Sequence, residues 1–216
     1  MNNLDVNTIK VIAFDADDTL WVNETYFREA ENEFVTLLSE FGSESLIHKM
    51  LYEKEIQNLE AYGYGVKGFV LSMVECALEV SNYKVPPEII EQILQIGKRM
   101  LKEPLKLIDG IEDVLSELQK KHKLVVATKG DLLDQEKKVK LSGLDGFFSK
   151  VYVMSNKKEE NYQTIIDDLE INPDNLLMIG NSIKSDVLPV VKLGGKAIHI
   201  PFHTTWIHEE LSLIHI

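Results

Sequence analysis

Residues 9–20 read IKVIAFDADDTL, and the strongest indication of the fold lies there. The first half, IKVIAF, is short, apolar and rich in β-branched residues, which is typical of a strand buried on both faces of a parallel sheet. Acidic residues follow it at once, which indicates that the strand ends at a functional loop. We therefore predict a first strand at 9–14 and a candidate site that begins at Asp15.

Beyond Pro104, strand-like and helical segments alternate along the chain. The apolar runs KLVVAT, KVYVM, NLLMI and KAIHI predict strands at 123–128, 150–154, 175–179 and 196–200. Helices are expected at 110–121, 131–142, 159–169 and 184–193. Five strands joined by helical crossovers predict an α/β fold with a doubly wound, Rossmann-like parallel sheet.

Between the first strand and Pro104, helical spacing replaces strand-like segments. Apolar residues from Phe27 to Phe41 recur at helical intervals and stop at Gly42, where a helix would end. Further helices are expected at 44–61, at 66–81 and from Pro86 to Lys102. This predicts two domains, an α/β core of residues 1–21 and 103–216 and an inserted helical domain of residues 22–102.

Charge and composition exclude several classes of function. The chain has 216 residues, with 23 Lys and Arg against 35 Asp and Glu, a formal charge of −12. Such a balance repels nucleic acid and anionic membranes, so we expect neither as a partner. Cys76 is the only cysteine, and the first residues lack the basic and apolar regions of a signal peptide. We therefore expect a cytoplasmic protein, and the sequence does not predict its oligomeric state.

Polar residues follow four of the predicted strands. In a parallel sheet ligands bind beyond the carboxyl ends of the strands, so these residues are expected at one edge. They are Asp15 and Asp17 after the first strand, Thr128 and Lys129 after the second, Lys157 or Lys158 after the third, and Asn181 with Asp186 after the fourth.

The residue types at this edge favour phosphoryl chemistry. Two carboxylates one residue apart face the same side of an extended chain, and their repulsion is relieved by a cation such as Mg²⁺. Asp15 could then accept a phosphoryl group covalently, with Asp17 as the acid and base. Thr128 and Lys157 could bind the phosphoryl oxygens, and Lys129 is a further candidate for this role.

These motifs resemble those of the haloacid dehalogenase superfamily, and within it the phosphatases. The first is a strand followed by D-x-D-x-T, here FDADDTL, and the second is a strand that ends in Thr, here VVATKG. The third is a Lys ahead of a helix, here Lys157, and the fourth is an acidic pair after a strand, here GNSIKSD. The resemblance covers residues 9 to about 200 and is specific because all four motifs occur in order at strand ends.

The resemblance implies a role for each residue. Asp15 would be the nucleophile and a magnesium ligand, and Asp17 the acid and base that also binds the metal through its backbone carbonyl. Thr128 and Lys157 would bind and neutralise the phosphoryl group, while Asp186 would support the metal. The inserted helices would form a cap of the C1 type, which closes over the substrate.

One position departs from the pattern, because Asn181 stands where the family usually has an Asp. An amide oxygen can bind Mg²⁺ but brings no charge, so weaker metal binding or greater reliance on Asp186 is expected. The second acid, Asp17, favours phosphate esters over carbon–halogen bonds, because a departing alkoxide needs a proton and a halide does not. The sequence thus predicts a Mg²⁺-dependent phosphatase for a small phosphorylated metabolite. A phosphomutase and a non-catalytic binding protein on the same fold are the alternatives.

Overall fold

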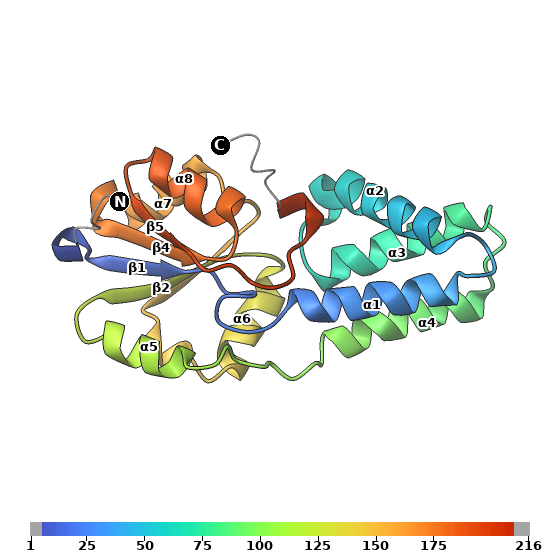
Figure 1. Ribbon diagram of the computed structural model, residues 1–216, viewed down its shortest axis with the longest axis horizontal. Helices are drawn as coiled ribbons and strands as arrows, with labels where there is room; N and C mark the ends of the chain where they lie inside the picture. The colour runs from blue at the N-terminus through green and yellow to red at the C-terminus, as the bar shows by residue number, and fades with distance from the viewer. Residues whose placement is uncertain (1–5, 210–216) are drawn as a thin grey trace. The chain divides into compact units, whose positions relative to one another are not determined.

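The structure, a computed structural model, describes residues 6–209 and contains a five-stranded sheet. The strands follow the order β3-β2-β1-β4-β5, and every neighbouring pair is parallel (Figure 1). Their bounds are β1 Val11–Phe14, β2 Lys123–Lys129, β3 Lys150–Met154, β4 Leu176–Gly180 and β5 Lys196–His199. The predicted α/β fold with a doubly wound parallel sheet is confirmed. Residues 1–5 and 210–216 of the predicted core domain lie outside the described residues.

Helices cover both faces of the sheet (Figure 1). On one face, Ile12 and Phe14 of β1 pack with residues of α5 Ile111–Leu118 and α6 Leu132–Leu141. On the other face, Val11 and Ala13 pack with residues of α7 Glu159–Asp168 and α8 Leu188–Lys192. All four β1 residues are buried, which explains why the strand is an unbroken apolar run rather than an alternating one.

The central strand β1 sets the position of the candidate site. It pairs with β2 on one side and with β4 on the other, so the order of the strands along the chain reverses there. The N–H of Asp15 donates to the carbonyl of Ile179 at 2.9 Å and extends the β1–β4 pairing by one residue. In open parallel sheets, a ligand crevice forms beyond the strands at such a reversal, and Asp15 lies at this edge.

A second compact unit, Thr25–Pro104, is helical. The helices of the inserted stretch are α1 Glu24–Leu37, α2 Glu44–Tyr62, α3 Val66–Val80 and α4 Pro87–Met100. Pro87 is the first residue of α4, where its missing N–H costs no hydrogen bond. Gly97 permits the approach of α4 to α3, because a Cβ at this position would overlap the side chain of Val70.

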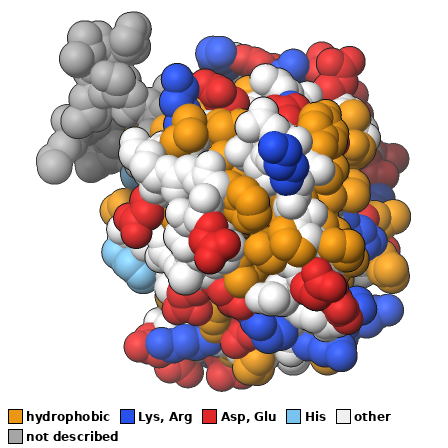
Figure 2. Space-filling model, turned by 90° about the vertical axis from the view of Figure 1, so that its right-hand side faces the viewer, with side chains coloured by type: hydrophobic (Ala, Val, Ile, Leu, Met, Phe, Trp, Pro, Cys, Tyr) orange, Lys and Arg blue, Asp and Glu red, His pale blue; other side chains and the backbone are white. Residues whose placement is uncertain are grey.

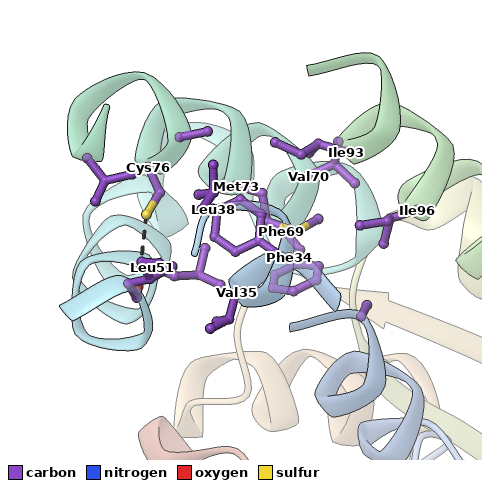
Figure 3. Packing of buried hydrophobic residues seen from close by; sticks show 14 of the residues in the cluster. Phe34, Val35, Leu38, Leu51, Phe69, Val70, Met73, Cys76, Ile93 and Ile96 are labelled. Carbon is purple, nitrogen blue, oxygen red and sulfur yellow. Dashed lines mark hydrogen bonds between the residues drawn. The ribbon is translucent and has the colours of Figure 1, made fainter. Parts of the chain in front are cut away.

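The helical unit has its own hydrophobic core (Figure 3). Phe34 of α1 and Leu38, directly after α1, lie with Met73 of α3, and each is fully buried. Cys76 also belongs to this core, and its Sγ lies 4.0 Å from the carbonyl oxygen of Ile47. Burial raises the pKa of the Cys76 thiol to about 12, so this cysteine is a packing residue.

Both units carry a charged surface with scattered hydrophobic residues. Figure 2 shows one face on which hydrophobic side chains lie among acidic and basic ones. In the helical unit, the large hydrophobic side chains that are exposed include Leu46, Tyr62, Leu71, Tyr83 and Leu94. Across residues 6–209, no helix combines the length and the apolar character needed to cross a membrane.

The chain after β4 differs from the prediction of one helix over 184–193. A π-helical turn, η4 Ile183–Val187, comes first, and the short helix α8 follows it. The hydroxyl of Ser182 accepts from the N–H of Ser185 and begins the turn, while Pro189 lies in the first turn of α8 and has no N–H to continue the ladder. π-Helical turns are rare and occur often at functional sites.

Candidate active site

Three charged side chains from different strand ends meet at the carboxyl edge of the sheet. The ammonium of Lys157, after β3, donates to Oδ1 of Asp15, after β1, and lies 2.6 Å from Oδ1 of Asp186 in η4. Their residues are only 4%, 7% and 1% exposed, respectively. Buried charges are stable only when they are paired, so each member of this Asp–Lys–Asp cluster depends on the others.

The cluster contains two carboxylates and one ammonium. Burial raises the pKa of Asp15 to about 7, and the Asp186 carboxylate adds to this effect while Lys157 opposes it. For Lys157, burial alone would lower the pKa, but Asp15 and Asp186 outweigh it and hold the pKa well above its usual value. Fully ionised, the three groups carry one net negative charge in a buried place, which a proton or a bound cation would offset.

The chain after β4 is shaped to present Asp186. A Cβ at Gly180 would overlap the Asp186 carboxylate, so only glycine allows that side chain to fold over the end of β4. The N–H of Ser182 donates to the other carboxylate oxygen of Asp186 at 2.9 Å. From the neighbouring helix, the Tyr162 hydroxyl donates to the carbonyl of Ser185 at 3.0 Å and fixes the turn from α7.

Asp17 is held by a different set of donors. Its Oδ1 accepts from the indole N–H of Trp21 at 2.8 Å and from the Lys138 ammonium at 3.1 Å. Its Oδ2 accepts from the Gln135 amide at 2.7 Å. Burial alone would raise the pKa of Asp17, but Lys138, Gln135 and Trp21 outweigh it and hold the pKa below its usual range.

The loop after β1 turns instead of remaining extended, since the N–H of Leu20 donates to the carbonyl of Ala16 at 2.8 Å. Asp18 has a φ of 62° and turns the chain at this point. Its carboxylate accepts from the backbone N–H groups of Asn23 at 2.8 Å and Glu24 at 3.0 Å, where α1 begins. Asp18 is therefore a helix cap that fixes the loop between β1 and α1.

The remaining predicted residues lie at neighbouring strand ends. Thr128 is 1% exposed at the end of β2, and its hydroxyl donates to the carbonyl of Lys129 at 3.2 Å. The Lys129 ammonium donates to the Ser185 hydroxyl at 2.9 Å. The backbone carbonyl of Asn181 accepts from Nε2 of His199 at 2.9 Å.

The two candidate lysines differ clearly in environment. Lys157 is buried in the charged cluster, whereas Lys158 is exposed at the start of α7. The backbone N–H of Lys158 donates to the Asn161 side chain at 3.1 Å, as expected of a residue that precedes a helix. The structure thus brings Lys157, and not Lys158, to Asp15.

The oxygen ligands at this edge fit a hard divalent cation. Asp15 and Asp186 bring two carboxylates together at Lys157, a composition that suits Mg²⁺ because this ion prefers hard oxygen ligands and keeps several waters. Within residues 6–209, no three His, Cys, Asp or Glu side chains cluster in a way that could hold a metal ion. A zinc-type site built from such side chains therefore finds no support in the described part of the chain.

Some residues that contact the predicted site residues were not themselves predicted. Gln135 and Lys138 lie one turn apart on α6 and both reach Asp17, so a polar pair at helical spacing after the second strand was an available signal. Glu209 pairs with Lys129 from a segment after β5. No local pattern marks Glu209, because the two partners are 80 positions apart in the sequence.

The fold and the site together define an α/β protein with a buried Asp–Lys–Asp cluster at the carboxyl edge of a parallel sheet. A family model described as haloacid dehalogenase-like hydrolase matches residues 9–194. The chain belongs to this family of hydrolases.

Proteins similar to this chain include solved structures and named hydrolases. A haloacid dehalogenase-like family hydrolase from Xanthomonas campestris is 36% identical with a TM-score of 0.86, and the match covers 90% of this chain and 82% of that one. The N-acylneuraminate-9-phosphatase of Mus musculus is 21% identical over 94% of this chain and 84% of its own length. The putative HAD-hydrolase YfnB of Bacillus subtilis is 25% identical over 82% of this chain and 78% of its own. A structure of YfnB bound to magnesium has a TM-score of 0.60 at 21% identity and covers 88% of this chain and 85% of that one.

Proposed function

We propose that this hydrolase is a Mg²⁺-dependent phosphatase that acts on a small phosphorylated metabolite through a phosphoryl group carried by Asp15. The observation that supports this most strongly is the buried cluster in which Lys157 bridges Asp15 and Asp186. A phosphate ester brings negative charge to such a site, and Lys157 is positioned to neutralise part of it.

Asp15 is the proposed nucleophile. One of its carboxylate oxygens accepts from Lys157 and the other accepts from the Thr19 hydroxyl at 3.3 Å, so the side chain has a fixed orientation. Attack on phosphorus requires the ionised form, and a pKa of about 7 leaves Asp15 partly protonated in the free protein. A bound Mg²⁺ would supply positive charge that offsets the clustered carboxylates. Asp15, Asp186, Asn181 and the Asp17 carbonyl would hold it.

Asp17 is the proposed acid and base. In the first step it would protonate the departing alkoxide, and in the second it would take a proton from the water that releases phosphate from Asp15. Its low pKa suits the second step, because an ionised carboxylate accepts the proton. The first step requires a protonated Asp17, which the contact with Lys138 disfavours. We therefore expect that contact to loosen when substrate binds.

Thr128 and Lys157 are the residues that we propose bind the phosphoryl oxygens. Lys129 remains a predicted binding residue for the same group. The role of the helical unit in selecting the substrate also stays a prediction. The N-acylneuraminate-9-phosphatase and magnesium-bound YfnB support a phosphatase that uses magnesium. The second acid of the D-x-D pair supports phosphate esters over organohalides as substrates.

Phosphate release from a panel of phosphorylated metabolites, with and without Mg²⁺, tests the proposal. The panel should include sugar phosphates, phosphoglycolate and nucleotides, and the variant Asp15→Asn should be tested beside the parent. We expect Mg²⁺-dependent release that Asp15→Asn abolishes while the variant stays folded. Transfer of the phosphoryl group to another hydroxyl would instead identify a phosphomutase. Bound Mg²⁺ without turnover of any ester would support a non-catalytic binding protein.

A further inference from the structure

A carboxylate from outside the four motifs is built into the edge of the site. Glu209 ends the short helix η5 Ile207–Glu209, and this residue lies beyond the segment that the family model matches. Its Oε1 pairs with the Lys129 ammonium. Its Oε2 accepts from the hydroxyls of Ser182 and, at 2.6 Å, Ser185.

These contacts hold Glu209 as an anion. The Glu209 and Lys129 side chains are only 12% and 15% exposed, so solvent screens the pair weakly. Burial alone would raise the pKa of Glu209, but Lys129 and the two serine hydroxyls outweigh it and lower the pKa to about 2. Such a well-satisfied carboxylate is a fixed part of the structure.

The contacts of Glu209 lead to Asp186 through the π-helical turn. Ser182 donates through its hydroxyl to Glu209 and through its backbone N–H to Asp186. Ser185, directly before Asp186, donates to Glu209 and accepts from Lys129. Glu209 thus joins the end of β2 to the turn that presents a candidate magnesium ligand.

We propose that Glu209 is a positioning residue that offsets the charge of Lys129 and fixes the η4 turn, so that a divalent cation can bind at Asp15 and Asp186. The physical reason is that an ammonium beside this turn repels a cation unless a carboxylate offsets it. The inference rests on the proposed magnesium site and not on the identity of the substrate.

The test compares Mg²⁺ affinity in four proteins by titration calorimetry. Glu209→Gln keeps the shape of the side chain but removes the charge that offsets Lys129, and Mg²⁺ binding should weaken about tenfold. In the double variant Lys129→Met/Glu209→Gln, no charge remains to be offset, so affinity should return to within about threefold of the parent. Glu117→Gln removes an exposed acid on α5 that pairs with Lys120, and serves as the matched control with parent-like affinity.

Thermal unfolding without Mg²⁺ gives a second readout that needs neither metal nor turnover. Glu209→Gln should lower the midpoint by about 5 °C, and the double variant should recover part of that loss. If Glu209→Gln does not fold alone, that loss of folding together with a folded double variant of parent-like Mg²⁺ affinity supports the proposal.

Three results would overturn this role for Glu209. In the first, Glu209→Gln and Glu117→Gln bind Mg²⁺ with equal affinity. In the second, the double variant binds Mg²⁺ as weakly as Glu209→Gln does. In the third, the parent binds no Mg²⁺. A parent that binds Mg²⁺ but releases no phosphate from any ester would contradict the proposed phosphatase and leave the test of Glu209 intact.

Discussion

Replacement of Lys157 by Met tests the buried cluster on which the site depends. Lys157 has a side chain that is 1% exposed, between Asp15 at 9% and Asp186 at 1%. Methionine has a similar volume, so it leaves no large cavity, but it removes the only positive charge in this Asp–Lys–Asp cluster. The variant therefore isolates the cost of two buried carboxylates without their lysine.

The size of that cost follows from the burial. Loss of one partner from a buried ion pair destabilises a protein by about 3–5 kcal/mol. Asp15 has a pKa of about 7 even with the lysine present, so it can take up a proton near neutral pH and limit the loss. We therefore expect the free energy of unfolding of Lys157→Met to be lower than that of the parent by about 3 kcal/mol at about pH 8.

The Asp15 carboxyl group also determines how the stability difference between Lys157→Met and the parent changes with pH. Loss of the lysine raises the pKa of Asp15 further, so the folded variant binds more protons than the folded parent as pH falls toward about 5. The difference in stability between variant and parent should shrink over that range. Magnesium should also reduce the difference, because a cation offsets the same carboxylates.

Urea unfolding followed by circular dichroism measures these differences, at about pH 8 and about pH 5, with and without Mg²⁺. Lys158→Met is the matched control, because this exposed neighbour makes no ion pair with the cluster and should change stability by less than about 0.5 kcal/mol. Equal losses in the two variants, or a Lys157→Met loss that grows at low pH, would refute the reasoning.

Three further predictions concern other parts of the site. Asp17→Asn should slow phosphate release from an alkyl phosphate by about a hundredfold or more. Transfer of the phosphoryl group from p-nitrophenyl phosphate to the protein should slow less, because the p-nitrophenolate leaving group needs no proton. Burst kinetics measure the rates of both reactions. Gly180→Ala should cost about 2 kcal/mol in urea unfolding because its methyl group meets the Asp186 carboxylate, and an unchanged midpoint would contradict the packing. The pKa of Glu209 is lowered to about 2, so its stabilising contribution is present above the unfolded value of 4.5 and is lost as pH falls from 4.5 to about 2. The difference in the free energy of unfolding between the parent and Glu209→Gln should therefore shrink over this pH range. A difference that stays constant would contradict the prediction.

Local sequence patterns predicted the sheet and the cluster on it. The apolar run of β1 indicates burial on both faces, and parallel strands bring the residues after each strand to one edge. This logic predicts that Asp15, Asp186 and one of the two lysines, Lys157 or Lys158, lie together at that edge. It needed only the order of strands and the chemistry of the residues that follow them.

Other features depend on contacts that no local pattern contains. The loop that follows Asp17 bends at Asp18, whose φ of 62° is uncommon for a residue other than glycine. The η4 turn depends on hydrogen bonds between Ser182 and Asp186, which a helical pattern over 184–193 does not reveal. Glu209 pairs with Lys129, which is 80 positions away in the sequence, so no local pattern reveals the contact.

The phosphoryl group on Asp15 is the central claim, and peptide mapping by mass spectrometry after a rapid acid quench tests it most directly. When the parent is mixed with Mg²⁺ and a phosphate ester that it hydrolyses, the peptide that contains Asp15 should carry a phosphoryl group. The corresponding peptide of Asp15→Asn should carry none. A phosphoryl group on any other residue, or an Asp15→Asn variant that still releases phosphate at the parent's rate, would contradict the account.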